Sequence, residues 1–330
     1  MCRASLFPPA GSPILLPFAN FPAFIIMIDT TSMRYPTLLL LLLTCATVAL
    51  RADTTSPRVL IVTAHPDDET TMAATVWKIT HALGGVVDLA LVTNGEGGYK
   101  YSSLGNIIYG HELTDEDTGR ALLPAIRKRE LMAGGEIIGL RNYFFLDQRD
   151  HLFTLNVDST VGYVWDTAYV ARRLTEIMRD GDYDYIFALL PTPETHGHHK
   201  GATIVALEAA ARLAPAERPA VLGVSTSDSG DAVTPFRGLD GYARTAIAGG
   251  LPSFQFDRRA TFGFKDQLTY SIIVNWLIAE HKSQGTMQLG VNRGDYEEFW
   301  WFDMNDRERF GETTTLFRRL AEPFFEELEY

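Results

Sequence analysis

Cysteine is almost missing from this sequence. The two cysteines of the 330-residue chain, Cys2 and Cys45, both lie in an apolar N-terminal segment. The rest of the chain therefore has no disulfide and no thiolate, which excludes a disulfide-stapled scaffold, a cysteine-ligated metal and a cysteine nucleophile. A G-x-S-x-G run is also missing, so the nucleophile elbow of a serine hydrolase is not indicated.

Positive charge is scarce as well. Lys and Arg total 29 against 41 Asp and Glu, which gives a net charge of −12. This balance argues against a nucleic acid as the partner and favours a neutral or cationic small substrate. No low-complexity tract or fixed-period repeat appears, and 46% hydrophobic residues suffice for a large core. We expect an ordinary globular protein after the N-terminal segment.

The N-terminal segment has the pattern of an export signal. From Met33 it contains the basic Arg34, an apolar stretch from Leu38 to Leu50, and the small residue Ala52. About 14 apolar residues fall short of the ~20 that span a bilayer. We therefore predict that residues 1–52 direct export to the periplasm, the cell surface or the medium. An uncleaved membrane anchor is the alternative, because residues upstream of Met33 are apolar too.

After about residue 57, short β-rich runs alternate with amphipathic stretches, which is typical of a parallel sheet covered by helices. Strands are expected at residues 59–63, 86–93, 143–146, 185–190 and 220–225, and helices at 70–83, 126–139, 168–179, 200–213 and 268–280. We predict an α/β, Rossmann-like fold with a mostly parallel sheet and helices on both faces. Residues 53–225 would form the catalytic core, and residues 226–330 a C-terminal extension that completes the same domain.

A histidine and three carboxylates follow the first expected strand, in the run His65-Pro66-Asp67-Asp68-Glu69. Because Pro66 keeps His65 extended, His65 and Asp68 can turn toward one metal ion. Asp67 must aim differently, which suits a base that accepts a proton from a water molecule. Glu69 falls at a helix start, where free amides favour a carboxylate, so a structural role is as well supported as a catalytic one.

Three of the eight histidines stand together in His196-Gly197-His198-His199, directly before an expected helix. If the turn is already helical, the spacing of His196 and His199 places both rings on one face, so that one can bind metal and the other face a substrate. His198 would then project elsewhere. Both motifs follow strands, so they can meet beyond the carboxyl ends of the sheet. A solvated polar loop is the alternative for this cluster.

Together these motifs resemble the PIG-L, or LmbE-like, family of zinc-dependent deacetylases, which act on N-acetylated sugars and related glycoconjugates. The residues that carry the resemblance are His65 to Glu69 (an AHPDDE-type motif), Gly95-Glu96 (a Gly-Glu turn), Arg127 to Glu130 (an RxxE helix), Asp147 and Asp150 after the next strand, and His196 to His199 (HxxH). The match covers roughly residues 58–225. Two departures stand out: His198 replaces a frequent aspartate, and a long, flexible segment over residues 99–124 precedes the RxxE helix.

The resemblance implies an LmbE-like fold and hydrolysis of the N-acetyl amide of an N-acetylglucosamine-type sugar. It implies Zn²⁺, or another divalent ion such as Fe²⁺, at His65, Asp68 and His199. Asp67 would be the general base, and a protonated His196 would assist the oxyanion or the leaving group. A zinc hydrolase of a different amide, such as a thiol-sugar conjugate or an acylated glycopeptide, is one alternative. A sugar-binding module without turnover is the other.

Further residues are weaker candidates. Glu96, Arg127 and Asp150 are expected near the substrate, although an exposed or supporting ion pair with Glu130 is favoured for Arg127. His281 ends an expected helix, where backbone carbonyls would satisfy its ring. The aromatic run at residues 299–302 is expected in the core or in a subunit contact, and a homo-oligomer stays open.

Overall fold

The computed structural model describes residues 56–324. The predicted export signal at residues 1–52 lies outside them, so export and the alternative anchor stay predictions. Within residues 56–324, no helix has the length and apolar character of a membrane span.

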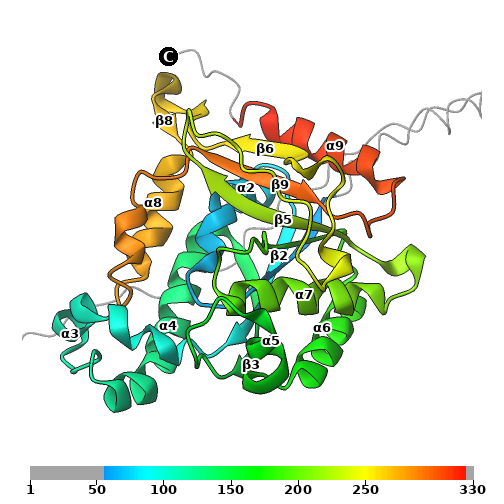
Figure 1. Cartoon of the computed structure of the whole chain (residues 1–330). Coiled ribbons are helices and arrows are strands. Elements are labelled where there is room, and N and C mark those ends of the chain that lie inside the picture. The colour runs from blue at the N-terminus through cyan, green and yellow to red at the C-terminus, as the bar shows by residue number, and fades with distance from the viewer. Residues whose placement is uncertain (1–55, 325–330) are drawn as a thin grey trace, which may run out of the picture. The chain divides into compact units, whose positions relative to one another are not determined.

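A mixed sheet forms the centre of the described residues, with the strand order β3-β2-β1-β4-β5-β9-β6 (Figure 1). Its strands are β1 (Arg58–Thr63), β2 (Val86–Thr93), β3 (Leu140–Gln148), β4 (Tyr185–Leu189), β5 (Ala220–Ser227), β6 (Phe254–Asp257) and β9 (Tyr296–Trp301). The first five run parallel, β9 is antiparallel to β5, and β6 is antiparallel to β9. A separate hairpin pairs β7 (Thr261–Phe262) with β8 (Leu268–Thr269). The predicted Rossmann-like α/β fold with a mostly parallel sheet is confirmed.

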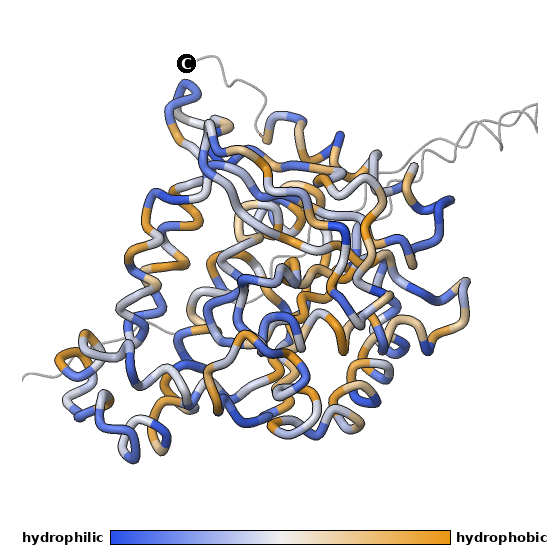
Figure 2. The backbone as a smooth tube through the Cα atoms, viewed as in Figure 1, coloured by the Kyte–Doolittle hydropathy of each residue, from blue (hydrophilic) through white to orange (hydrophobic). Residues whose placement is uncertain are grey.

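Helices cover both faces of this sheet. The α-helices are α2 (Ala73–His81), α3 (Ser103–Tyr109), α4 (Glu116–Ile138), α5 (Val157–Ser159), α6 (Thr167–Gly181), α7 (Gly197–Ala211), α8 (Ser271–Glu280) and α9 (Arg309–Ala321). Successive residues of β1 point to opposite faces: Val59 and Ile61 pack with α2, α4, α8 and α9, and Leu60 and Val62 pack with α6 and α7. Figure 2 shows the hydrophobic residues gathered along the central elements and hydrophilic ones in outer loops.

The expected start of helix α4 is wrong. The segment over residues 99–124, expected as a flexible insertion, contains α3 and the first turns of α4. Helix α4 begins at Glu116 instead of residue 126, with Asp115 accepting a hydrogen bond from the Thr118 amide as its N-cap and with Pro124 inside the helix. Proline removes one helical hydrogen bond, but Leu123 and Ile126 on either side are buried against Leu113. This packing holds the helix continuous through the proline.

The C-terminal part of the chain contributes four strands that the sequence pattern did not predict, and two of them, β6 and β9, belong to the central sheet. The aromatic run at residues 299–302 is buried, as expected for core, but most of it belongs to β9. Helix α8 begins at Ser271 because β8 takes residues 268–269. The boundary drawn at residue 225 between core and extension stays a prediction.

The strand order places both sequence motifs at one point. From β1 the chain builds outward through β2 and β3, and then returns to the other side of β1 to form β4. Ligands of doubly wound sheets bind where the strand order reverses, beyond the carboxyl ends of the strands. His65 follows β1, and residues 196–199 follow β4. The topology therefore brings the two motifs to the switch point.

We expect Glu297→Ala to lower the free energy of unfolding by about 3–5 kcal/mol, because removing one partner strands a buried charge. The Glu297 carboxylate is fully buried and accepts hydrogen bonds of 2.9 Å from the amides of Ala74 and Thr75 and from Nε of Arg258. Urea unfolding would measure the loss. Glu208→Ala, which removes a half-exposed ion pair with Arg244, should cost less than about 1 kcal/mol. Equal losses in the two variants would contradict the prediction.

Candidate active site

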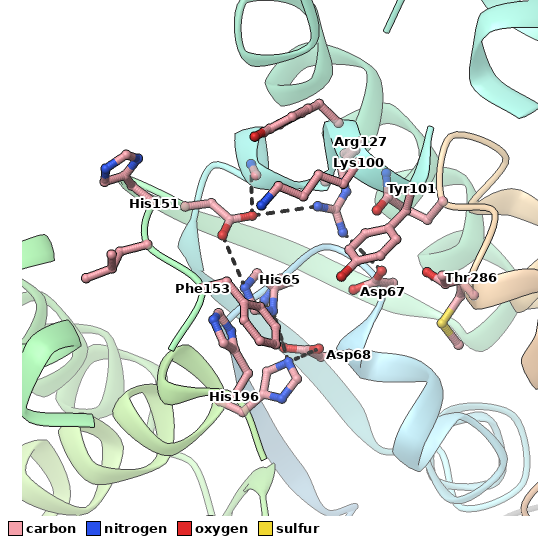
Figure 3. Close-up of a pocket in the computed structure, with 18 of the residues that line it drawn as sticks. His65, Asp67, Asp68, Lys100, Tyr101, Arg127, His151, Phe153, His196 and Thr286 are labelled. Carbon is pink, nitrogen blue, oxygen red and sulfur yellow. Dashed lines mark hydrogen bonds and ion pairs between the residues drawn. The ribbon is translucent and has the colours of Figure 1, made fainter. Parts of the chain in front are cut away.

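The two motifs meet at the edge of the sheet. Nδ1 of His65 lies 3.0 Å from Nε2 of His199, and Oδ1 of Asp68 lies 3.2 Å from the same nitrogen. Each of the three residues offers one ligand atom, and these atoms all lie within 4.8 Å of one another. Figure 3 shows His65, Asp68 and His196 around one end of a cavity. The geometry suits a cation, and the assignment of these residues as ligands stays a prediction.

Local contacts aim the three side chains. Oδ2 of Asp68 accepts hydrogen bonds from the amides of Ala64 (2.9 Å) and His65 (2.8 Å), which leaves Oδ1 to face His199. Nδ1 of His199 lies 2.8 Å from the Thr195 hydroxyl. A proton on that nitrogen would leave a lone pair on Nε2, which is how outer partners orient metal-binding histidines.

A glycine allows the histidine motif to approach the site closely. Helix α7 starts at Gly197, directly after His196. A Cβ atom at Gly197 would lie 2.8 Å from the Thr160 hydroxyl and 3.0 Å from the Thr154 carbonyl oxygen. Glycine is therefore required where the backbone turns into the helix.

The histidines and carboxylates of this group shift one another's pKa values. Burial alone would lower the pKa of His65, but the Asp150 and Asp68 carboxylates raise it to about 10. Burial alone would raise the pKa of Asp68, but His199 and His65 hold it well below its usual range. The site therefore favours a positive charge between carboxylates. Two imidazoles and one carboxylate also form a donor set that divalent zinc accepts, so the residues present fit such an ion.

Asp67 lines the cavity beside this group and is held by an arginine. Nη2 of Arg127 lies 3.0 Å from Oδ2 of Asp67, and Arg127 also donates to the carbonyl oxygens of Gly95 (2.9 Å) and Pro66 (3.3 Å). The expected pairing of Arg127 with Glu130 is wrong. Both side chains are buried, and Glu130 instead accepts hydrogen bonds from the amide and hydroxyl of Ser283, at 2.7 and 2.6 Å.

His196 lines the cavity in a neutral state. Its ring stacks on that of Phe153, with centroids 4.7 Å apart, and its Nε2 has no hydrogen-bond partner among the described residues. Burial and the neighbouring His198, His65 and His199 lower its pKa to about 3. This lowered pKa favours a neutral ring, whereas the sequence reasoning expected a protonated one, and the catalytic role of His196 stays a prediction.

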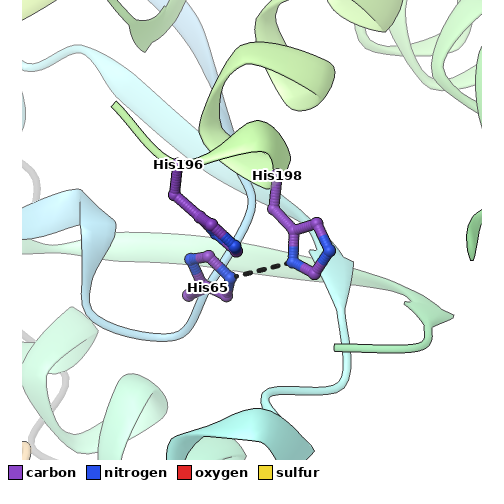
Figure 4. A group of neighbouring side chains, drawn as sticks. All are labelled: His65, His196 and His198. Atoms are coloured by element: carbon purple, nitrogen blue, oxygen red, sulfur yellow. Dashed lines mark hydrogen bonds between the residues drawn. The ribbon is translucent and has the colours of Figure 1, made fainter. Parts of the chain in front are cut away.

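The spacing predicts that His198 projects away from the site, and the structure contradicts this prediction. It is fully buried, and its Nδ1 lies 3.3 Å from Nε2 of His65 (Figure 4). The same Nδ1 lies 3.3 Å from Oδ1 of Asp150. Burial lowers the pKa of His198. The backbone changes from an extended conformation at His196 to helix at Gly197, which sequence spacing cannot specify, and this change turns the His198 ring inward.

Of the remaining candidates, Asp150 faces the site and Glu96 does not line the cavity. Asp150 is buried, and its Oδ2 accepts a hydrogen bond of 3.1 Å from the Gly97 amide. Burial would raise the pKa of Asp150, but His65, His198 and Arg127 hold it well below its usual range. Glu96 forms ion pairs with Arg149 (3.4 Å) and Arg120 (3.5 Å) instead.

A second buried pair lies next to the site. Nε2 of His281 is 2.6 Å from Oε1 of Glu69, and both side chains are fully buried. Backbone carbonyls do not satisfy this ring, so that expectation is wrong, and its Nδ1 has no partner in the described part of the chain. This pair ties the end of α8 to the first motif.

The cavity next to these groups has a volume of about 880 Å³. Such a volume suits a ligand larger than a single small ion or water cluster. Its lining also includes residues that the sequence reasoning did not single out for binding, among them Lys100, Glu116, Arg120, His151, Leu152, Phe153, Gln284, Thr286 and Met287. Only their positions in the folded chain reveal them, because they come from α4 and from three other separate segments of the chain.

Comparison with known proteins gives a family and several relatives. Residues 60–210 match the family model PIG-L, described as GlcNAc-PI de-N-acetylase. A probable N-acetyl-alpha-D-glucosaminyl L-malate deacetylase 2 of Bacillus cereus is 26% identical over 175 residues, which are 53% of this chain and 70% of the relative. The matched range of the family model contains both motifs.

Solved structures with similar folds include two that differ in their described activity. The N,N'-diacetylchitobiose deacetylase of Pyrococcus horikoshii is 20% identical with a TM-score of 0.42, over 83% of this chain and 94% of that one. GalB, the 4-carboxy-2-hydroxymuconate hydratase of Pseudomonas putida, is 14% identical with a TM-score of 0.46, over 76% of this chain and 97% of that one.

Proposed function

Because residues 60–210 of this chain match the PIG-L family model, we propose that the protein is a metal-dependent hydrolase that removes the acetyl group from an N-acetylglucosamine-type sugar or glycoconjugate. One observation carries the proposal: His65, Asp68 and His199 converge at one end of a cavity that Asp67 also lines. The described substrates of the family and of the Bacillus cereus relative, both N-acetylglucosaminyl compounds, agree with it.

His65, Asp68 and His199 would hold the metal, which we propose is Zn²⁺, with Fe²⁺ as the alternative. When bound, the ion polarises the amide carbonyl and the attacking water. The outer contacts of these ligands support this assignment: the Thr195 hydroxyl faces the second ring nitrogen of His199, and Asp150 lies 3.5 Å from that of His65.

The chain's own groups move the protons. Asp67 accepts a proton from the water that attacks the amide carbon, and Arg127 keeps its carboxylate in place. The neutral His196 lines the cavity, and its Nε2 has no hydrogen-bond partner among the described residues. In this proposal its ring N–H donates to the carbonyl oxygen as that oxygen gains negative charge. The carbon–nitrogen bond then breaks, and the amine takes the proton from Asp67. The products are acetate and the free amino sugar.

Acetate release by the purified protein, with its metal content measured, tests this function. The panel would contain N-acetylglucosamine, its β-linked oligomers, and inositol- and lipid-linked forms. Release from any of them supports the proposal. Zinc bound without release from any would favour a different amide, such as a thiol-sugar conjugate or an acylated glycopeptide. Saturable sugar binding without turnover would favour a binding module.

Zinc binding near pH 7 should release protons. In the metal-free protein the Asp150 and Asp68 carboxylates, against the opposing effect of burial, raise the pKa of His65 to about 10, so its ring is protonated at pH 7 and must lose a proton to become a ligand. The apparent affinity should therefore rise as the pH increases toward 10. Titration calorimetry in two buffers of different ionisation enthalpy would count the protons. A binding enthalpy that does not depend on the buffer would contradict this expectation.

We also propose that residues 1–52 export the protein. N-terminal sequencing of the protein recovered outside the cytoplasm would reveal a cleaved signal, whereas an intact N-terminus in the membrane fraction would indicate an anchor. Size-exclusion chromatography of the same material would test for a homo-oligomer.

A further inference from the structure

Each of the two ring nitrogens of His65 faces a different group of atoms. Its Nδ1 faces His199 and Asp68, the proposed metal ligands. Its Nε2 lies 3.3 Å from Nδ1 of His198 and 3.5 Å from Oδ1 of Asp150. These two atoms are themselves 3.3 Å apart. Three polar atoms thus form a nearly equilateral triangle on the side of His65 away from the proposed metal.

The backbone determines the tautomer of His198. Its Nε2 lies 3.1 Å from the carbonyl oxygen of His151. A carbonyl oxygen only accepts hydrogen bonds, so the ring nitrogen that faces it must carry the proton. In a neutral imidazole the other nitrogen then carries a lone pair, so Nδ1 of His198 is a hydrogen-bond acceptor. The ring cannot turn away, because it is fully buried and packs on Trp165 with centroids 5.2 Å apart.

Asp150 is fixed as well. Its Oδ2 accepts from the Gly97 amide at 3.1 Å, which aims Oδ1 at the two rings. The triangle therefore contains two acceptors, Nδ1 of His198 and Oδ1 of Asp150. Only a donor on Nε2 of His65 satisfies both.

We propose that His198, together with Asp150, holds the single proton of His65 on Nε2. Nδ1 of His65 then carries the lone pair that binds the metal. His198 is thus a positioning residue that acts through His65. The inference rests on the proposed metal site. It also explains why an imidazole is suited to this position: a carboxylate at residue 198 would place a second negative charge next to Asp150, whereas a neutral ring supplies the acceptor without the charge.

A second cation in the triangle is the competing explanation. His65 would then have to lose the protons of both ring nitrogens to solvent, so that each nitrogen could bind one ion. A single proton on Nε2 satisfies the same atoms at no such cost, so the geometry favours the proton. The two explanations differ in the number of metal ions that each chain binds.

The test compares two amide variants of His198 by chelator competition for zinc and by metal analysis. His198→Asn keeps an oxygen acceptor near the position of Nδ1, whereas His198→Gln moves its amide toward the His151 carbonyl and leaves Nε2 of His65 without this acceptor. We expect His198→Gln to weaken zinc affinity about 10- to 100-fold, the usual effect of losing an outer partner of a ligand, and His198→Asn to weaken it less. His111→Asn, at an exposed histidine, is the matched control.

¹⁵N NMR of the unaltered, zinc-loaded protein gives a second readout that does not depend on how the variants fold. We expect one proton on His65, at Nε2, and one on His198, at Nε2. A His65 ring protonated at Nδ1, or a doubly protonated His198, would overturn the inference. So would two zinc ions per chain, or a His198→Gln protein that binds zinc as tightly as the wild type. Wild-type protein that binds no zinc would overturn the proposed function and this inference with it.

Discussion

Asp67→Asn protein is expected to bind one zinc ion per chain and to lose turnover by roughly 10²- to 10⁴-fold, the usual contribution of a positioned general base. Asparagine has the shape of aspartate and can still accept the hydrogen bond of Arg127. It cannot take a proton from water, so the step that it removes is chemical and not structural. Metal analysis and acetate release on the same preparation would measure both quantities.

A matched control is available at the same end of the sheet. Asp147, near the end of β3, is an exposed carboxylate paired with Lys128, and it does not line the cavity. Asp147→Asn should leave turnover close to that of the wild type. If Asp67→Asn were fully active, another group would have to be the base. If it lost zinc, Asp67 would belong with the ligands.

The proposed metal-binding residues could be predicted from the sequence because their positions depend on local rules. A buried β-rich run predicts β1, Pro66 prevents a helix from starting at His65, and parallel strands end at a common edge. Those rules place His65 and His199 in the same region without any knowledge of distant contacts. The five predicted strands all exist. Four of them are short, mostly buried runs, whereas β3 is largely half-buried or exposed.

The features that sequence reasoning missed depend on contacts between distant residues. Glu69 and His281 are 212 positions apart, and nothing local to either residue indicates the other. Strand β9 forms because β5 offers an edge, so the aromatic run at residues 299–302 could be predicted as core but not as a strand. The partner of His198 Nε2, the His151 carbonyl oxygen, lies on a loop 47 positions away, which no spacing rule specifies.

His199→Ala is expected to abolish stoichiometric zinc binding and, with it, acetate release. Nε2 of His199 is the atom nearest to both other donors, 3.0 Å from His65 and 3.2 Å from Asp68, so its loss leaves only two ligands. Two ligands are fewer than the three protein ligands that catalytic zinc sites use. The loss of affinity should therefore exceed the 10- to 100-fold effect of removing an outer partner.

A graded variant separates the loss of a ligand from a general disturbance of α7. Thr195→Val removes only the hydroxyl that faces Nδ1 of His199, so its zinc affinity should fall by the smaller, 10- to 100-fold amount while metal still binds. The His199 side chain is about one quarter exposed, at 24%, and its truncation should leave the fold intact, which thermal unfolding of the metal-free proteins would verify. The order of affinities, wild type above Thr195→Val above His199→Ala, is what a direct ligand requires. Zinc retained at one ion per chain in His199→Ala would remove His199 from the metal site and would leave the second histidine motif without its proposed role.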